Sequence, residues 1–212
     1  MSKEMNQPEN GKKLTIHERK NMFRRWIFNA GLGYNFETQQ APAVAFSMRK
    51  ALRKIYPNDD EYIEAMDNHY KYFNANPLMA NIILGATLAM EEKDGIKAKD
   101  AVQSLKTSLM GPFSGVGDSV FWILIPTIMG SISGYMSLQG NAVGAILWMA
   151  LQLSFYWLKM WFFKTGYDSG TKLITSLGEK INIFTDAISV MGLMVVGSLI
   201  PTVVKVYTPI KI

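Results

Sequence analysis

The pattern of apolar and polar positions changes character near the middle of the chain. Before residue 110, apolar residues recur every three or four positions in short stretches that polar turns separate. After residue 110 they run in long blocks with few charges. Helical spacing predicts amphipathic helices, and a block of about twenty apolar residues predicts a membrane span. The sequence therefore predicts an all-α integral membrane protein, with amphipathic and re-entrant helices in its N-terminal half and about three long transmembrane helices in its C-terminal half.

The N-terminal half contains the signals of several short helices. Thr15 and Glu18 have the spacing of a capping box, which predicts that a helix begins after Thr15. Its apolar face lies opposite a basic one, which is typical of a helix at the cytoplasmic membrane interface. That apolar face comprises Ile16, Phe23, Trp26, Ile27 and Ala30. A second helix is predicted over 43–56, with an apolar stripe of Val44, Met48, Leu52 and Ile55.

Three further elements follow in this half. A helix is predicted after Asp60, with an apolar stripe of residues at helical spacing, which are Ile63, Met66, Tyr70 and Phe73. Residues 77–90 are apolar but too few to span a bilayer, so they predict a re-entrant or buried segment. The charged run from Glu91 to Gly95 is expected to return the chain to water. Residues 98–110 predict an amphipathic helix with Val102, Leu105 and Leu109 aligned.

The C-terminal half contains three apolar segments of spanning length, at 120–139, 142–163 and 183–204. Trp and Phe residues surround Lys159 in the second segment, as in an aromatic belt with a snorkelling base. The predicted organisation is a disordered tail over 1–13, an amphipathic and re-entrant helical region over 14–110, and a transmembrane region over 111–212.

Charge and composition support a membrane location. Residues 1–110 hold 16 of the 22 Lys and Arg and 13 of the 17 Asp and Glu. The net charge of +5 fits attraction to a membrane surface and not nucleic-acid binding. The chain contains no cysteine, which excludes disulfides and thiolate metal sites. Its polar N-terminus lacks the apolar core of a signal peptide, and basic residues flank the second segment on one side, so the N-terminus is expected in the cytoplasm.

The stretch from Gly111 to Ser119 is the most informative one in the chain. Glycine costs roughly 1 kcal/mol and proline about 3 kcal/mol inside a helix, so Gly111, Pro112, Gly115 and Gly117 predict a break just before the first span. An acid beside a broken backbone at membrane depth is typical of solute sites in transporters, which makes Asp118 a candidate substrate ligand. The alternative is that Asp118 caps the helix that follows it, and capping is the favoured interpretation.

A second polar cluster lies between the first two predicted helices. Asn35, Glu37 and Gln40 provide the amide and carboxylate groups that pair with sugar hydroxyls. The alternative for Asn35 and Glu37 is structural, with Asn35 capping a helix over 36–56 and Glu37 in its first turn. His17 and His69 are interpreted as ordinary surface or interface histidines. No catalytic constellation, metal-ligand spacing, phosphate loop or cofactor motif is predicted.

Four motifs in order resemble the IID subunit of the mannose/fructose/sorbose family of sugar phosphotransferase systems. The resemblance covers about residues 14–207. The motifs are Tyr34-Asn35-Phe36-Glu37 with Gln40, the run from His69 to Pro77, Ile83-Leu84-Gly85-Ala86 with Glu91-Glu92, and the run from Leu109 to Asp118 with Phe121-Trp122.

The resemblance implies a non-catalytic transport subunit of a multi-pass permease in the bacterial cell membrane. Such subunits pair with a IIC subunit to move a hexose of the mannose, glucose, fructose or sorbose type, which a cytoplasmic IIAB protein phosphorylates. The chain departs from the family at Thr38-Gln39 and in ending before the family's last hydrophobic segment. A membrane anchor or receptor without transport of its own is the alternative function.

Overall fold

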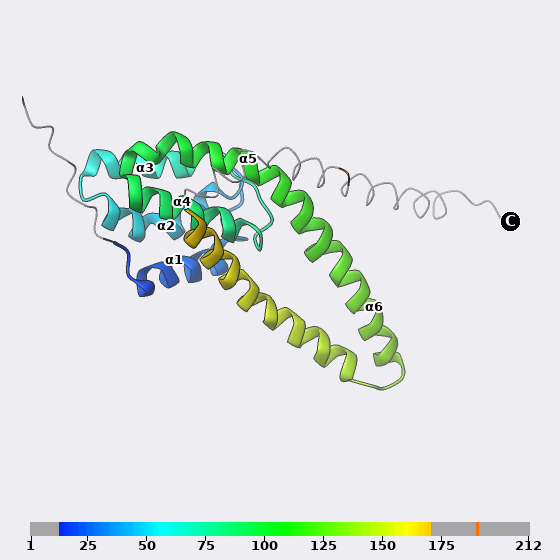
Figure 1. Ribbon diagram of the computed structural model, residues 1–212. Coiled ribbons are helices and arrows are strands. Elements are labelled where there is room, and N and C mark those ends of the chain that lie inside the picture. The colour runs from blue at the N-terminus through cyan, green and yellow to red at the C-terminus, as the bar shows by residue number, and fades with distance from the viewer. Residues whose placement is uncertain (1–12, 171–189, 191–212) are drawn as a thin grey trace, which may run out of the picture.

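The computed structural model describes residues 13–170 and residue 190, and its helices form two parts (Figure 1). The first part is a bundle, and the second is a long hairpin that projects from it. The bundle helices are α1 (Ile16–Asn29), α2 (Ala41–Ile55), α3 (Asp59–Tyr70), α4 (Ala80–Asp94) and α5 (Lys99–Gly117), with a 3₁₀ turn at Gly95–Ala98. A π-helical segment, Asp118–Leu124, leads into α6 (Ile125–Leu138), and the helix Val143–Gly170 returns to the bundle.

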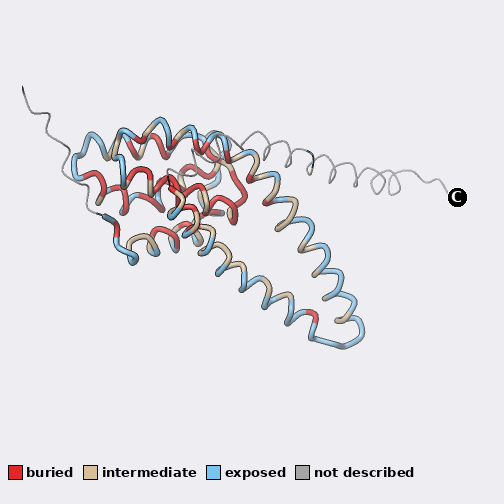
Figure 2. The backbone as a smooth tube through the Cα atoms, viewed as in Figure 1, coloured by how far each residue is buried: buried red, intermediate tan, exposed pale blue. Residues whose placement is uncertain are grey.

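The hairpin confirms the predicted membrane character. The continuous helical stretch that ends at Leu138 and the helix Val143–Gly170 are each long and apolar enough to cross a bilayer. Only 6% of the apolar stretch in each helix is buried inside the protein, so these helices are not the core helices of a soluble protein. Figure 2 shows buried backbone concentrated in the bundle and almost none along the hairpin. The predicted third span, 183–204, and the predicted tail lie outside the described residues, apart from residues 13 and 190.

The capping box at the start of α1 is confirmed. Thr15 Oγ1 accepts from the backbone N–H of Glu18, and the Glu18 carboxylate accepts from the backbone N–H of Thr15. Lys54 of α2 donates to the same carboxylate at 2.6 Å. These hydrogen bonds lower the pKa of Glu18 to about 2, and the bond from Lys54 has the largest effect. The ion pair thus joins the beginning of α1 to the end of α2.

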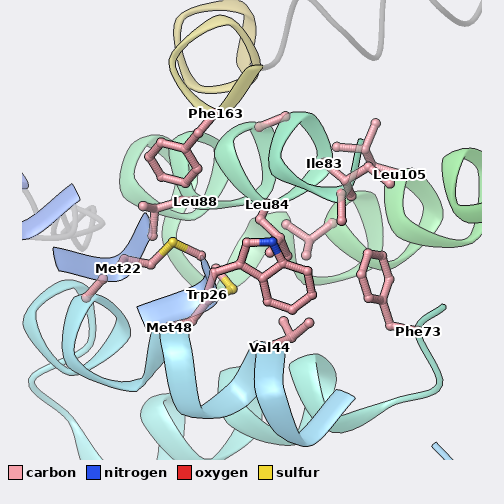
Figure 3. Packing of buried hydrophobic residues seen from close by; sticks show 14 of the residues in the cluster. Met22, Trp26, Val44, Met48, Phe73, Ile83, Leu84, Leu88, Leu105 and Phe163 are labelled. Carbon is pink, nitrogen blue, oxygen red and sulfur yellow. The ribbon is translucent and has the colours of Figure 1, made fainter. Parts of the chain in front are cut away.

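Helix α4 occupies the centre of the bundle. Ten of its fifteen residues are buried, which confirms the buried alternative for the short apolar segment. Trp26 of α1 is fully buried against it and donates its indole N–H to the carbonyl of Pro77 at 3.3 Å. Figure 3 shows Trp26 among the side chains of α2 and α4, with Phe163 entering from the helix Val143–Gly170.

Two assignments of helix faces need correction. The Phe23 and Trp26 face of α1 packs inside the bundle and not against the membrane interface, and Ile16 is 64% exposed. In α3, Ile63 and Tyr70 are exposed. The buried face of α3 instead comprises Ala65, Asn68 and His69, because polar side chains there find partners on α4 and α5. The stripes of α2 and α5 are buried as predicted.

The predicted break at the Gly-Pro motif is wrong, because the chain stays helical through it. Helix α5 includes Pro112, and the only departure from α geometry is the π-helical segment that begins at Asp118. The apolar stripe of Leu105, Leu109 and Phe113 continues across the motif and is buried throughout. Packing of this stripe outweighs the low helix propensity of the glycines and the proline. π-Helical turns occur often at functional sites.

Two glycines bring the hairpin onto the bundle. A Cβ atom on Gly85 of α4 would overlap the carbonyl oxygen of Phe163, and one on Gly166 would overlap the carbonyl oxygen of Ile82. The two helix backbones are therefore in direct contact, as small residues allow. Phe163 is buried beside this crossing and extends the bundle core into the hairpin.

We expect Gly85→Ala to lower the stability of the protein by about 2–3 kcal/mol, because the added methyl group meets backbone atoms that cannot rotate away. The measurement is thermal unfolding in detergent, followed by tryptophan fluorescence. Gly130→Ala is the matched control, since nothing lies within 4 Å of the position of its Cβ atom. Equal melting temperatures for the two variants would contradict the close helix crossing.

Candidate functional site

The loop from Tyr34 to Gln40 is a tight turn that the side chain of Asn35 organises. The Asn35 amide oxygen accepts from the backbone N–H groups of Glu37 and Thr38, at 2.9 and 2.8 Å. Asn35 and Gln39 also pair through their backbones, and Gln39 adopts a left-handed conformation with φ of 55°. Asn35 therefore has a structural role, but in this turn and not as a helix cap. Helix α2 begins after Gln40, so the predicted helix over 36–56 with Glu37 in its first turn is wrong.

Gln40 joins this loop to the segment Phe73–Asn76. Its side chain is fully buried, and its amide pairs with the backbone of Ala75 in both directions. Gln40 Nε2 donates to the Ala75 carbonyl at 2.8 Å, and Gln40 Oε1 accepts from the Ala75 N–H at 3.1 Å. Nε2 also donates to the hydroxyl of Tyr34. Both N–H donors of the amide are used inside the protein, so Gln40 has a supporting role in this structure.

Asp118 binds the same segment. Asn76 is almost fully buried, and its Nδ2 donates to Asp118 Oδ1 at 2.8 Å. Ser114 Oγ donates to the carbonyl of Asn74 at 3.2 Å. Gly117 packs so closely that a Cβ atom on it would overlap the Asn76 side chain. The run from Gly111 to Asp118 thus holds the Phe73–Asn76 segment, and Gly117 is the glycine that this contact requires.

The favoured capping role of Asp118 is wrong. Asp118 lies within a continuous helical stretch, where the preceding backbone is already helical, so no free helix end needs a cap. Its carboxylate is exposed and binds the side chain of Asn76 instead. Gly111 and Gly115 are also exposed, and nothing lies within 4 Å of a Cβ atom on Gly111.

The structure therefore brings two of the four candidate ligands, Gln40 and Asp118, to adjacent residues of one segment. Glu37 extends from the exposed side of the turn, and its carboxylate has no hydrogen-bond or ion-pair partner among the described residues. Phe36 beside it is fully exposed, at 101%. An accepting carboxylate next to an exposed aromatic ring has the chemistry of a sugar-binding surface. Asn76 was missed as a site residue, although it lies in the quoted run from His69 to Pro77.

A cluster of buried polar side chains lies between α3, α4 and α5, and the interpretation of His69 as a surface or interface histidine is wrong. His69 Nε2 lies 2.9 Å from Glu91 Oε2, and both side chains are buried. Lys106 is also buried and donates to the carbonyl of Asn68 at 3.0 Å. Burial, and then the nearby Glu91 carboxylate, raise the pKa of Tyr56. Glu91 was expected to return the chain to water. The helical spacing of Glu91 places it on the same face of α4 as other buried residues, and this sequence signal could have predicted its burial.

A cleft of about 460 Å³ opens between the two arms of the hairpin where they meet the bundle. Aromatic rings form much of its wall, and Phe121 and Phe155 meet edge to face with centroids 5.6 Å apart. Gln152 and Lys159 add polar groups to it. Polar side chains at membrane depth are costly unless they face a partner, a cavity or water.

Two apolar helices of spanning length that the bundle leaves uncovered are typical of a membrane protein, and a largely apolar cleft with a few polar groups between them is typical of a solute site. Comparison with known families identifies the family to which the chain belongs. Residues 13–212 match the family model described as the PTS system mannose/fructose/sorbose family IID component, and the chain belongs to this family.

Relatives with three different sugar names are similar to this chain. The fructose permease IID component of Bacillus subtilis (strain 168) is 34% identical over 213 residues, which cover 96% of this chain and 76% of the relative. The mannose-specific EIID component of Escherichia coli (strain K12) is 32% identical over 207 residues, covering 95% and 73%. The sorbose-specific EIID component of Klebsiella pneumoniae is 27% identical over 209 residues, covering 95% and 75%.

A solved structure shares the fold. A chain in the cryo-EM structure of the mannose transporter ManYZ with microcin E492 matches with a TM-score of 0.72 and 30% identity. The match covers 95% of this chain and 74% of that one. The all-helical fold and the membrane character of this chain therefore agree with those of a sugar transporter component.

We expect His69→Ala to destabilise the bundle by about 3–5 kcal/mol, because it leaves the Glu91 carboxylate buried without its partner. The double variant His69→Leu/Glu91→Leu should recover part of this loss, since it removes the unpaired carboxylate, while the ammonium group of Lys106 stays buried. The measurement is the melting temperature in detergent. Glu64→Gln, which removes an exposed ion pair with Lys99, is the control and should change little. A double variant no more stable than the single one would contradict the assignment.

Proposed function

We propose that this chain is the IID membrane subunit of a sugar permease, which pairs with a IIC subunit to move a hexose across the membrane. A cytoplasmic IIAB protein would phosphorylate the sugar, and this chain would supply no catalytic group. The names of its relatives include mannose, fructose and sorbose, so the proposal is for a hexose of the mannose, glucose, fructose or sorbose type. The observation that carries it is the unpaired Glu37 carboxylate on a loop that Gln40 and Asn76 connect to Asp118.

The need for a partner follows from the hairpin. Its apolar side chains are exposed along both arms, and Gln152 lies in the open cleft, more than one helical turn deeper in the apolar segment than Trp157 and Lys159. Lipid alone would leave this amide in hydrocarbon, whereas a second membrane subunit would cover it or enclose a solute path with it. Gly130 and Gly134 on α6 have no neighbour within 4 Å of a Cβ position, so a helix of the partner has room to approach there.

We expect Glu37→Gln to lower hexose uptake by about tenfold or more while the complex still assembles. The variant replaces a charged hydrogen-bond acceptor, which contributes about 1.5–3 kcal/mol to a bond, by a neutral one. Uptake of labelled hexose in cells that contain the whole system is the measurement. Glu61→Gln, an exposed glutamate on α3, is the matched control. Unchanged uptake and affinity in the Glu37 variant would remove Glu37 from the site.

Expression of this chain alone should give a poorly stable protein that binds no hexose, and expression with a IIC subunit should restore both yield and binding. Detergent co-purification followed by calorimetry with hexose measures each property. This experiment also separates a permease subunit from a membrane anchor or receptor, which would remain stable on its own. Hexose binding or transport by the reconstituted isolated chain would overturn the shared-path proposal.

We place the N-terminus in the cytoplasm, because the basic bundle precedes the first span and Lys159 and Lys164 lie near the bundle end of the second. The chain has no cysteine, so a single cysteine introduced at residue 10 reports on this side alone. An impermeant thiol reagent should label it only after the cells are opened. Labelling in intact cells would reverse the topology.

A further inference from the structure

A groove of about 320 Å³ lies where α1 crosses the helix Val143–Gly170, and neither the sugar site nor the hairpin cleft uses it. We call it the α1 groove. Its lining combines two cations with aromatic and thioether side chains and consists of Lys20, Phe23, Arg24, Tyr156, Trp157 and Met160.

The walls of the α1 groove are held in place by contacts on both sides of it. Phe23 meets the ring of Tyr156 edge to face at 5.7 Å, and it lies 5.7 Å from the ring of Phe163. The guanidinium of Arg19 lies 4.4 Å from the ring centroid of Tyr167. These contacts fix α1 against the spanning helix, so the groove is a preformed feature of the fold.

The charge of the α1 groove is uncompensated. Lys20 and Arg24 lie one helical turn apart and are both exposed. Neither forms an ion pair in the part of the chain that the structure describes, where the basic partners in ion pairs are Arg53, Lys54, His69 and Lys99. The groove therefore presents two positive charges without an acid, which favours an anionic ligand.

An exposed apolar track leads away from the groove along the spanning helix. Its members recur every three or four residues on one face of that helix and are Ile146, Met149, Leu153 and Trp157. By helical geometry this face points away from the cleft residues Gln152 and Lys159. Trp157 is 66% exposed and lies near the end of the apolar segment, where tryptophan marks the headgroup level of a bilayer.

We propose that the α1 groove binds a phospholipid with an anionic headgroup. Lys20 and Arg24 would hold the phosphate, and an acyl chain would follow the track from Trp157 toward Ile146. The pairing of cations at headgroup level with an apolar strip that runs into the membrane matches both ends of one such molecule. A soluble anion would bind only the two cations and leave the apolar track uncovered. An acidic protein surface would pair with the cations but would not cover an apolar track that runs into the bilayer.

The test uses the complete permease complex in vesicles of phosphatidylcholine that contain increasing fractions of phosphatidylglycerol. One of the two lipids carries bromine near the carbonyl end of its acyl chains and quenches nearby tryptophan fluorescence. The difference between the normal complex and the Trp157→Phe variant isolates the signal of Trp157. We expect brominated phosphatidylglycerol to quench this signal at a lower mole fraction than brominated phosphatidylcholine does.

Lys20→Gln/Arg24→Gln should reduce that preference by about 30-fold, because each of the two cations near the surface contributes on the order of 1 kcal/mol. Arg49→Gln/Lys50→Gln, which removes the same charge from the exposed face of α2, should keep it. Inorganic phosphate at matched ionic strength should not relieve the quenching.

Four results would overturn the proposal. Equal quenching by the two lipids would exclude selection of the headgroup, and equal losses in the two double variants would reduce the effect to general surface charge. Relief by inorganic phosphate would identify a free anion as the ligand. A Trp157 that neither lipid quenches would also overturn it, since a protein neighbour would then cover the groove.

Discussion

The segment Phe73–Asn76 is the point on which the polar part of this structure depends. Gln40 pairs with the backbone of Ala75, Asp118 binds the side chain of Asn76, and Ser114 binds the carbonyl of Asn74. These bonds join a loop before α2 to the junction between the bundle and the first span, although the three pieces are far apart in the sequence. A buried amide whose donors and acceptor are all used is costly to disrupt, so the loop that carries Glu37 has a fixed position relative to the membrane helices.

The second constraint is the crossing of Gly85 and Gly166. It places α4, the centre of the bundle, directly against the returning arm of the hairpin. The other arm is joined to the bundle by the continuous helix that runs through Pro112. Both arms of the hairpin are therefore fixed to the bundle. A movement of the bundle would therefore carry the loop of Glu37 with it, and would act on the hairpin through these two junctions.

Periodicity and apolar length were sufficient to predict the helices of the bundle, the membrane character and the buried stripes of α2 and α5. They failed where tertiary contacts oppose local preference. Pro112 predicts a break, yet the buried stripe around Phe113 keeps the helix intact. Glu91 and His69 look like surface residues until the fold brings them 2.9 Å apart. Asn35 and Asp118 are residue types that favour helix caps. The fold shows instead that Asn35 organises a turn and that Asp118 binds Asn76. Glu37 remains a prediction from residue type and resemblance, which its exposed and unpaired carboxylate supports.

The most direct measurement of the central claim, that the loop of Glu37 faces the sugar path, uses the lack of native cysteine. Phe36→Cys in the assembled complex should react with a thiol reagent, because residue 36 is fully exposed in this chain. The account predicts that the transported hexose slows this reaction several-fold, while the reaction of Ile63→Cys on the exposed face of α3 is unchanged. Equal rates at residue 36 with and without hexose would contradict it.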